Sequence, residues 1–578
     1  MLSVIQKIKN WQAILVITLV GIVTFASGMS SPFWDDDYTQ IVNNPVIDSL
    51  SHIKYLFEGS TFYLGRGIGP LSGTFYRPLM MVAYSILYAI FGANALAYHI
   101  ALLVLCILGA VVLYLIFRYP FSAPMALGLA LLYLVHPLNT QLTYAISSLG
   151  DALYMLFGFL GLWILLRFRS KKSLALVCIC LFLSLLAKET AIAFVMMAIL
   201  YVFWFSRERL KIFLLSLVPP IAIYFVLKIN AVGFMTPSTL APIDHYGLGV
   251  RLLNAPEIFM FYMSKVVMPL KLATGYYWVV THFSIEHVLI PFILDCLIIA
   301  GGVWLGVIIK RRLSKTQFYI YLFFSLWFLG GMLTCLQIVA IDMTVCETWF
   351  CFSLAGLLGM VGVGLQALKI DTKYLALIGV IVIFAFALRS AERGFDWHSS
   401  ATLAREDITV SPDDYNAYTN LSNIYSQEGK YTLAASYDYK SLQIFPTYYA
   451  YYDLGVNETN LRNYALAATA YSDGLSYGRV SLIYENLAAL TVANGSAAYD
   501  TSVFRSALSY YPKDPSIWTY LAIDEQKYGE HAKAQQYIQN AKKLGTVNPM
   551  VYYAIMNNRP LSVTLGTPPK TIIIPAVQ

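Results

Sequence analysis

Residues 94–117 read NALAYHIALLVLCILGAVVLYLIF, an apolar run without a single Asp, Glu, Lys or Arg. About 20 such residues are enough for a helix to cross the hydrocarbon core of a bilayer. The same character extends over much of the chain, which has 578 residues, is 58% hydrophobic and 12% charged, and has a mean hydropathy of +0.62. Soluble domains carry about 25% charged residues. The sequence therefore predicts a polytopic, all-α membrane protein.

Similar apolar runs recur up to residue 390, and basic residues gather in every second loop between them. We predict eleven spans, at 11–29, 94–117, 121–136, 150–166, 173–187, 189–205, 210–229, 287–309, 317–338, 347–368 and 373–390. The basic loops hold Lys7, Lys9, Arg118, Arg167, Arg169, Lys171, Lys172, Arg207, Arg209, Lys211, Lys310, Arg311, Arg312, Lys315, Lys369 and Lys373. The positive-inside rule assigns these loops and the N-terminus to the cytoplasm. An odd number of spans then places the C-terminal part outside.

Two further apolar stretches, at 79–91 and 256–280, would break this alternation if they crossed the membrane. Both are short or interrupted by polar residues, so we expect interfacial or re-entrant helices on the outer face. If both span, the C-terminus stays on the same side. The membrane domain is predicted to cover 1–395, with a first outer loop at 30–77. The run at 11–29 lacks an Ala-x-Ala exit, so we expect it to be retained as a span rather than cleaved.

A repeat of about 34 residues occupies 399–557 and precedes a tail at 558–578. Three positions recur in each of four units. The first is aromatic, the second, three residues later, is Leu, and the residue after it is small. The aromatic residues are Tyr418, Tyr451, Tyr484 and Trp518, the leucines are Leu421, Leu454, Leu487 and Leu521, and the small residues are Ser422, Gly455, Ala488 and Ala522. Gly429, Gly495 and Gly529 recur where two helices would join. This pattern resembles the tetratricopeptide repeat, whose helix pairs stack into an α-solenoid and present a protein-binding surface.

The first outer loop opens with WDDDY at 34–38, three acids directly after a predicted span. Carboxylates at the membrane surface can act as a general base, and a neighbouring acid can hold a divalent cation or an acceptor hydroxyl. The plain alternative is a solvated end of the helix. No cofactor is predicted firmly, and a divalent cation stays an open alternative. The seven cysteines lie in or beside apolar runs, so we expect neither a disulfide framework nor a metal site from them. The sequence also lacks the basic stripe with interleaved aromatic residues that is typical of nucleic-acid binding.

More motifs follow in order: YRPL at 76–79, HPLNTQ at 136–141, KE at 188–189 and ETWFCFS at 347–353. Together with the outer acids and the repeats, they resemble the transmembrane-and-tetratricopeptide-repeat O-mannosyltransferases and their bacterial relatives. The resemblance implies a GT-C fold and transfer of a sugar, mannose in the named family, from a polyprenyl-phosphate carrier to a Ser or Thr hydroxyl. It also implies a protein or peptide acceptor held by the repeats, and a location in a bacterial cytoplasmic membrane.

The same resemblance implies roles for individual residues. The acid pair of the family falls on Asp36 and Asp37, one of which would be the catalytic base. A substrate- or carrier-binding role would fall on Asp35, Arg77, His136, Asp151, Lys188, Glu189 and Glu347. Arg77 would pair with the phosphate of the leaving carrier.

The chain departs from the family pattern after Glu347. The relatives carry Arg, Tyr and Pro where this sequence has Thr348, Cys351 and Ser353. A catalytically inactive scaffold that docks proteins through its repeats is therefore one alternative. A glycan ligase or polymerase is another, although the outer loop near 337–347 has neither the Arg pair nor the His expected of one.

Overall fold

The computed structural model describes residues 8–63, 75–233, 241–368, 370–494, 502–528, 530–565, 570–574 and 576. The chain divides into two compact units, residues 1–413 and 414–578. Lys7, Lys369, Gly495 and Gly529, which the sequence analysis singled out, lie outside the described residues.

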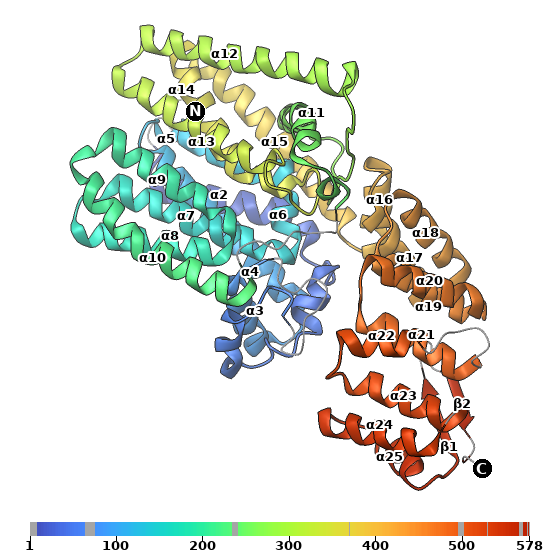
Figure 1. Cartoon of the computed structure of the whole chain (residues 1–578). Coiled ribbons are helices and arrows are strands. Elements are labelled where there is room, and N and C mark those ends of the chain that lie inside the picture. The colour runs from blue at the N-terminus through green and yellow to red at the C-terminus, as the bar shows by residue number, and fades with distance from the viewer. Residues whose placement is uncertain are drawn as a thin grey trace. The chain divides into compact units, whose positions relative to one another are not determined.

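The first unit is a bundle of helices, and a helix occupies each of the eleven predicted spans (Figure 1). They are α2 (Asn10–Phe25), α4 (Ala95–Phe117), α5 (Ala123–Val135), α7 (Leu149–Arg167), α8 (Lys171–Ala187), α9 (Ile192–Phe205), α10 (Leu210–Val232), α12 (Ile290–Arg312), α13 (Lys315–Cys335), α14 (Cys351–Leu368) and α15 (Thr372–Asp396). The prediction of an all-helical, polytopic membrane domain is confirmed.

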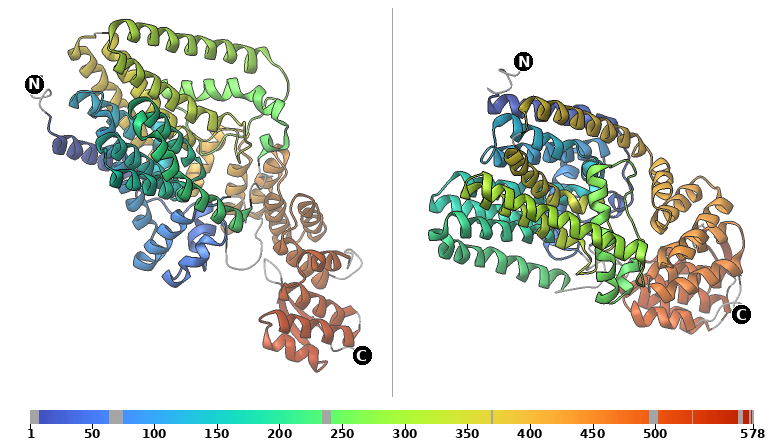
Figure 2. Two further views of the ribbon diagram at one scale, coloured as in Figure 1. Left: turned by 60° about the vertical axis from the view of Figure 1, so that its left-hand side comes forward. Right: turned by 90° about the horizontal axis from the view of Figure 1, so that it is seen from above.

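Eight of the described helices are long and apolar enough to cross a membrane, and a ninth span is possible if the bent pair α5 and 137–144 crosses as one. The remaining predicted spans, α8 and α9, are shorter, so the count of eleven stays a prediction. In α10 and in α12, only 17% of the residues in the most apolar stretch of the helix are buried. The two helices lie at opposite margins of the bundle (Figure 1, Figure 2). Their exposed apolar side chains suit contact with lipid rather than water.

The predicted basic loops meet at one end of this bundle. Four hydrogen bonds join the helix ends that carry them: Tyr114 to Asn10 (3.0 Å), Gln366 to Pro120 (3.3 Å), Arg312 to Ala367 (3.3 Å) and Arg209 to Ser170 (3.4 Å). Tyr201 interacts with Tyr119 and with the charges of Arg169 and Arg209. Gathering the basic groups on one side is the arrangement that the positive-inside rule requires.

The unit contains four further α-helices among its described residues: α3 (Pro78–Phe91), α6 (Thr140–Tyr144), α11 (Leu248–Val267) and α16 (Ser400–Val410). α3 coincides with the helix predicted at 79–91, whose place on the outer face stays a prediction. α11 begins earlier than the predicted 256–280 and ends before Pro269, after which residues 268–284 have no helix. Pro269 lacks the N–H that would continue the ladder, and it disfavours helical backbone in the residue before it. α16 belongs to the first unit, because the unit boundary falls between Asp413 and Asp414.

The second unit consists of successive helices: α17 (Tyr415–Gln427), α18 (Tyr431–Ile444), α19 (Tyr448–Asn460), α20 (Tyr464–Tyr477), α21 (Ser481–Asn494), α22 (Ser502–Tyr510), α23 (Pro515–Tyr528), α24 (His531–Leu544) and α25 (Pro549–Met556). The four recurring Leu residues of the repeat are all buried. A Cβ on Gly455 would lie 2.4 Å from the ring of Tyr471, which explains the small residue in that unit. Gly429 has φ +75°, which suits the turn between α17 and α18. The tetratricopeptide assignment itself stays a prediction.

The tail at 558–578 contains a hairpin that the sequence analysis did not anticipate. β1 (Leu561–Leu565) and β2 (Lys570–Ile574) pair antiparallel, with Leu561 opposite Ile574. Both of these side chains are buried, and they join the apolar cluster around α23, α24 and α25. The hairpin therefore closes the core at the end of the second unit.

Candidate functional site

The three outer acids follow the end of α2 in one tight turn. The Asp37 N–H donates to the Trp34 carbonyl, and the Trp34 N–H donates to Asp37 Oδ2, both at 2.9 Å. Asp35 takes a positive φ of 46°, which Asp tolerates better than most residues. The turn buries Asp37 at 2% exposure, leaves Asp36 half-buried and exposes Asp35. The neighbouring acids therefore have different environments.

Asp36 and Asp37 are both poised to hold a proton more tightly than an ordinary carboxyl. Burial raises the pKa of Asp37 to about 8, although the hydrogen bond from the Trp34 N–H lowers this pKa. Burial also raises the pKa of Asp36, and the charges of Asp35, Asp37 and Asp342 add to the rise while Arg77 opposes it. No hydrogen bond within the described residues ends on the Asp36 carboxyl. Asp36 is therefore free to accept a hydrogen bond from a substrate hydroxyl.

Arg77 immediately precedes α3 and is held by Glu189, which follows α8. Its Nε donates to Glu189 Oε2 at 3.3 Å, and the Tyr76 N–H donates to Oε1 of the same carboxylate at 3.0 Å. The guanidinium also stacks over the ring of Phe75 at 4.5 Å. This bidentate use of Glu189 fixes the start of α3 and keeps a cation close to Asp36.

A second, more deeply buried ion pair lies beside the first. Lys188 Nζ donates to Asp151 Oδ1 at 2.6 Å, and the two side chains are only 8% and 7% exposed. Asp151 sits in the first turn of α7 and Lys188 directly after α8, so the pair ties the ends of two adjacent helices. The charge of Asp151 also acts on Arg77. Arg77, Glu189, Lys188 and Asp151 thus form one network.

Asp342 belongs to the same group, although the sequence analysis did not single it out. It lies in the segment between α13 and α14, and burial raises its pKa while the charges of Arg77 and Lys188 lower it. It also acts on Asp36. A lone acid in a short loop that was predicted to be outer was the available signal. Without a motif around it, nothing connected Asp342 to Asp36, Arg77 and Lys188, which lie far earlier in the sequence.

Glu347 and His136, by contrast, take part in other contacts. Glu347 Oε1 accepts from the Tyr276 hydroxyl at 2.9 Å and from the Ala273 N–H at 3.0 Å, so Glu347 anchors the segment after α11. His136 accepts from the Leu138 N–H through Nδ1 and donates through Nε2 to the Val266 carbonyl, both at 3.2 Å. Both ring nitrogens of His136 are therefore engaged in holding the backbone. A role of either residue in binding the carrier stays a prediction.

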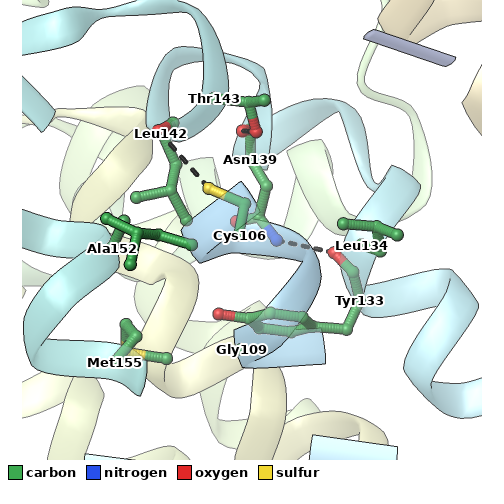
Figure 3. A pocket seen from close by; sticks show the side chains of 10 residues that line it. Cys106, Gly109, Tyr133, Leu134, Asn139, Leu142, Thr143, Ala152 and Met155 are labelled. Carbon is green, nitrogen blue, oxygen red and sulfur yellow. Dashed lines mark hydrogen bonds between the residues drawn. The ribbon is translucent and has the colours of Figure 1, made fainter. Parts of the chain in front are cut away.

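A small cavity lies apart from the outer acids, between α4, α5 and α7 (Figure 3). Cys106, Tyr133, Asn139 and Thr143 contribute its polar atoms. Asn139 donates to the Tyr133 carbonyl at 2.7 Å, and its own carbonyl oxygen has no partner among the described residues. The cavity has room for about one water molecule, so it is too small to hold a sugar.

The described residues offer no group of three or more His, Cys, Asp or Glu side chains arranged to hold a metal ion. The three outer acids do not converge, because Asp35 is exposed and Asp37 is turned back onto the Trp34 N–H. The donor set described here therefore does not fit a tightly held divalent cation, which would require several oxygen ligands from the protein.

Comparison with known proteins gives this site a context. Residues 77–230 match the family model of dolichyl-phosphate-mannose-protein mannosyltransferases. That range includes Arg77, Asp151, Lys188 and Glu189. A protein O-mannosyl-transferase of Caenorhabditis elegans is 21% identical over 471 residues, which are 77% of this chain and 64% of that protein. The chain thus spans less than two thirds of the length of this relative.

Two solved structures are also similar to the chain over most of its length. ArnT from Cupriavidus metallidurans bound to undecaprenyl phosphate has 11% identity and a TM-score of 0.36, with 79% of each chain covered. The oligosaccharyltransferase of Archaeoglobus fulgidus, tethered to an acceptor peptide, has 13% identity and a TM-score of 0.39, with 98% of this chain and 74% of that chain covered.

Proposed function

We propose that the chain, of which residues 77–230 match the family model of dolichyl-phosphate-mannose-protein mannosyltransferases, transfers a sugar, mannose as the first candidate, from a polyprenyl-phosphate carrier to a Ser or Thr hydroxyl of a protein. The observation that supports this proposal most directly is the half-buried Asp36 carboxyl, which has a raised pKa, no hydrogen bond within the described residues, and Arg77 beside it.

In the proposed reaction, Asp36 accepts the proton of the acceptor hydroxyl as its oxygen attacks the anomeric carbon. The bond from that carbon to the carrier oxygen breaks, and the carrier leaves as a phosphate anion. A single displacement inverts the anomeric centre. The raised pKa of Asp36 makes its carboxylate a stronger base than an exposed Asp. Asp37 holds the turn that aims Asp36, and Arg77 supplies positive charge near the reacting groups.

The repeats are proposed to hold the protein acceptor, which would raise its local concentration near the outer acids. We propose that the purified chain in nanodiscs moves radiolabelled mannose from polyprenyl-phosphate mannose to Ser/Thr-containing peptides. Label should not pass from a nucleotide-linked mannose. A preparation that is folded but transfers nothing from any polyprenyl-phosphate sugar would instead support the alternative of a catalytically inactive scaffold protein. A preparation that extends a glycan rather than labelling the peptide would support the alternative of a glycan ligase or polymerase.

The reaction is proposed to take place on the non-cytoplasmic side, with the N-terminus in the cytoplasm. A reporter active only in the cytoplasm, fused after Gln578, should therefore stay silent, whereas the same reporter fused after Arg312 should be active. Arg312 ends α12 at the basic end of the bundle, so the second fusion is a matched positive control. An active reporter after Gln578 would reverse the proposed topology.

A further inference from the structure

Three cations gather at the end of the bundle opposite the basic loops, and neither the proposed reaction nor the catalytic network uses them. Lys265 is in the last turn of α11, Lys271 lies in the segment that follows, and Arg389 is on α15. Lys265 Nζ donates to the Lys271 carbonyl. Arg389 donates to the Leu270 carbonyl through Nε at 3.1 Å and through a terminal nitrogen at 2.8 Å. The carbonyls of two consecutive residues, Leu270 and Lys271, thus accept hydrogen bonds from a guanidinium and an ammonium, which places the two cations close together.

Few carboxylates pair directly with this cluster, although Lys265 Nζ lies over the Phe261 and Tyr276 rings at 5.1 and 5.8 Å. Within the described residues, the one carboxylate at ion-pair distance is Glu392, 3.4 Å from Arg389 and with a side chain 70% exposed. Burial lowers the pKa of Lys265, and the charges of Lys271 and Arg389 lower it further, against an opposing effect of Glu347. A lysine ammonium has three donors and a guanidinium five, so several N–H groups of the cluster are left over. The cluster therefore has the charge and the donors to receive an anion.

The surroundings of the cluster are apolar and exposed. Val267, Leu270 and Leu388 are 79%, 59% and 62% exposed, and each lies within two residues of one of the three cations in the sequence. In a membrane protein, such side chains face acyl chains, and cations beside them lie at the depth of lipid headgroups. The anion most abundant at that depth is the phosphate of a phospholipid.

We propose that Lys265, Lys271 and Arg389 form a binding site for the headgroup phosphate of an anionic phospholipid at the non-cytoplasmic boundary of the membrane. The site opens to bulk lipid, unlike the buried pair of Lys188 and Asp151. A bound phosphate would fix the segment 268–283. Through Ala273 and Tyr276, this segment also holds Glu347, so the lipid would stabilise the outer side of the membrane domain.

The test compares the full-length chain in phosphatidylcholine nanodiscs with and without phosphatidylglycerol. Phosphatidylglycerol should raise the unfolding temperature of the wild type, and Lys265→Gln/Lys271→Gln should lose this rise. Because each cation near a membrane surface contributes about 1 kcal/mol, the double variant should bind phosphatidylglycerol roughly 30-fold more weakly in native mass spectrometry. Lys542→Gln/Lys543→Gln, with the same change of charge on exposed α24 residues, should behave as wild type.

Lys271→Gln alone is the milder variant if the double variant folds poorly, because the exposed Lys271 side chain makes no ion pair within the described residues. An equal effect of phosphatidylglycerol on wild type and variants would overturn the proposal. So would a site that responds to polyprenyl phosphate and not to phosphatidylglycerol, because it would then serve the carrier. Failure of glycosyl transfer itself would not affect this test, since its readouts are binding and unfolding.

Discussion

Asp36→Asn should reduce the initial rate of sugar transfer by about 10²–10⁴-fold, the usual contribution of a positioned general base. The amide has nearly the same size as the carboxyl but cannot take a proton from the acceptor hydroxyl. No hydrogen bond within the described residues ends on the Asp36 side chain, so the variant should keep the wild-type unfolding temperature. Transfer to a short peptide from polyprenyl-phosphate mannose measures the rate directly.

Asp48→Asn is the matched control on the same outer loop. Asp48 is exposed and pairs with His52 at 3.1 Å, so its replacement should change the rate less than twofold. Wild-type transfer by a folded Asp36→Asn variant would remove Asp36 from the mechanism and shift attention to Asp37.

The dependence of kcat/KM on pH gives an independent check of the same base, because its acid limb reports the ionisation of the free enzyme. Arg77 lowers the pKa of Asp36 and Asp342 raises it. Arg77→Gln should therefore move the acid limb to higher pH, and Asp342→Asn should move it to lower pH. Arg77→Lys, which keeps the charge, should leave the limb close to its wild-type position. Shifts in the same direction for both neutral variants would contradict Asp36 as the titrating base.

Much of the site was accessible from the sequence because its residues stand in motifs that resemble those of a known family. The resemblance pointed to Arg77, Lys188 and Glu189, and the structure brings them together with Asp36 and Asp151. The partners within this group could not be predicted. The spacing did not show that Arg77 pairs with Glu189 while Lys188, the next residue, pairs with Asp151. That choice depends on how α3, α7 and α8 pack.

The fold shows the same division between local pattern and packing. Hydropathy located a helix for each predicted span, because in lipid the backbone must satisfy its hydrogen bonds within the segment. It did not predict where α11 begins, since Arg251 and Asn254 interrupt the apolar residues at the start of that helix. Nor did it predict that α16 joins the membrane domain. That connection depends on Asp407, whose carboxylate accepts hydrogen bonds from the Thr274 hydroxyl at 2.5 Å and from Arg393 at 3.0 Å. No repeating sequence pattern indicates these contacts.

Lys188→Met should destabilise the membrane domain by about 3–5 kcal/mol, because it leaves the Asp151 carboxylate buried without its partner. The ammonium and the carboxylate are 2.6 Å apart, and both side chains are less than a tenth exposed. Methionine fills the space of the lysine stem, so the loss should reflect charge rather than a cavity. The unfolding temperature of the purified chain in detergent, followed by tryptophan fluorescence, measures the effect.

The double variant Lys188→Met/Asp151→Leu separates a structural pair from a carrier-binding lysine. Replacing both charges by apolar groups of similar volume is often neutral, so the double variant should recover most of the lost stability. Lys533→Met, which breaks the exposed pair with Glu530 at 3.0 Å in the second unit, should leave the unfolding temperature unchanged. If Lys188 instead binds the carrier phosphate, Lys188→Met should retain stability and lose transfer. Transfer by a stable double variant would then show that the pair positions α7 and α8 without touching the substrate, because both charges would be absent during turnover.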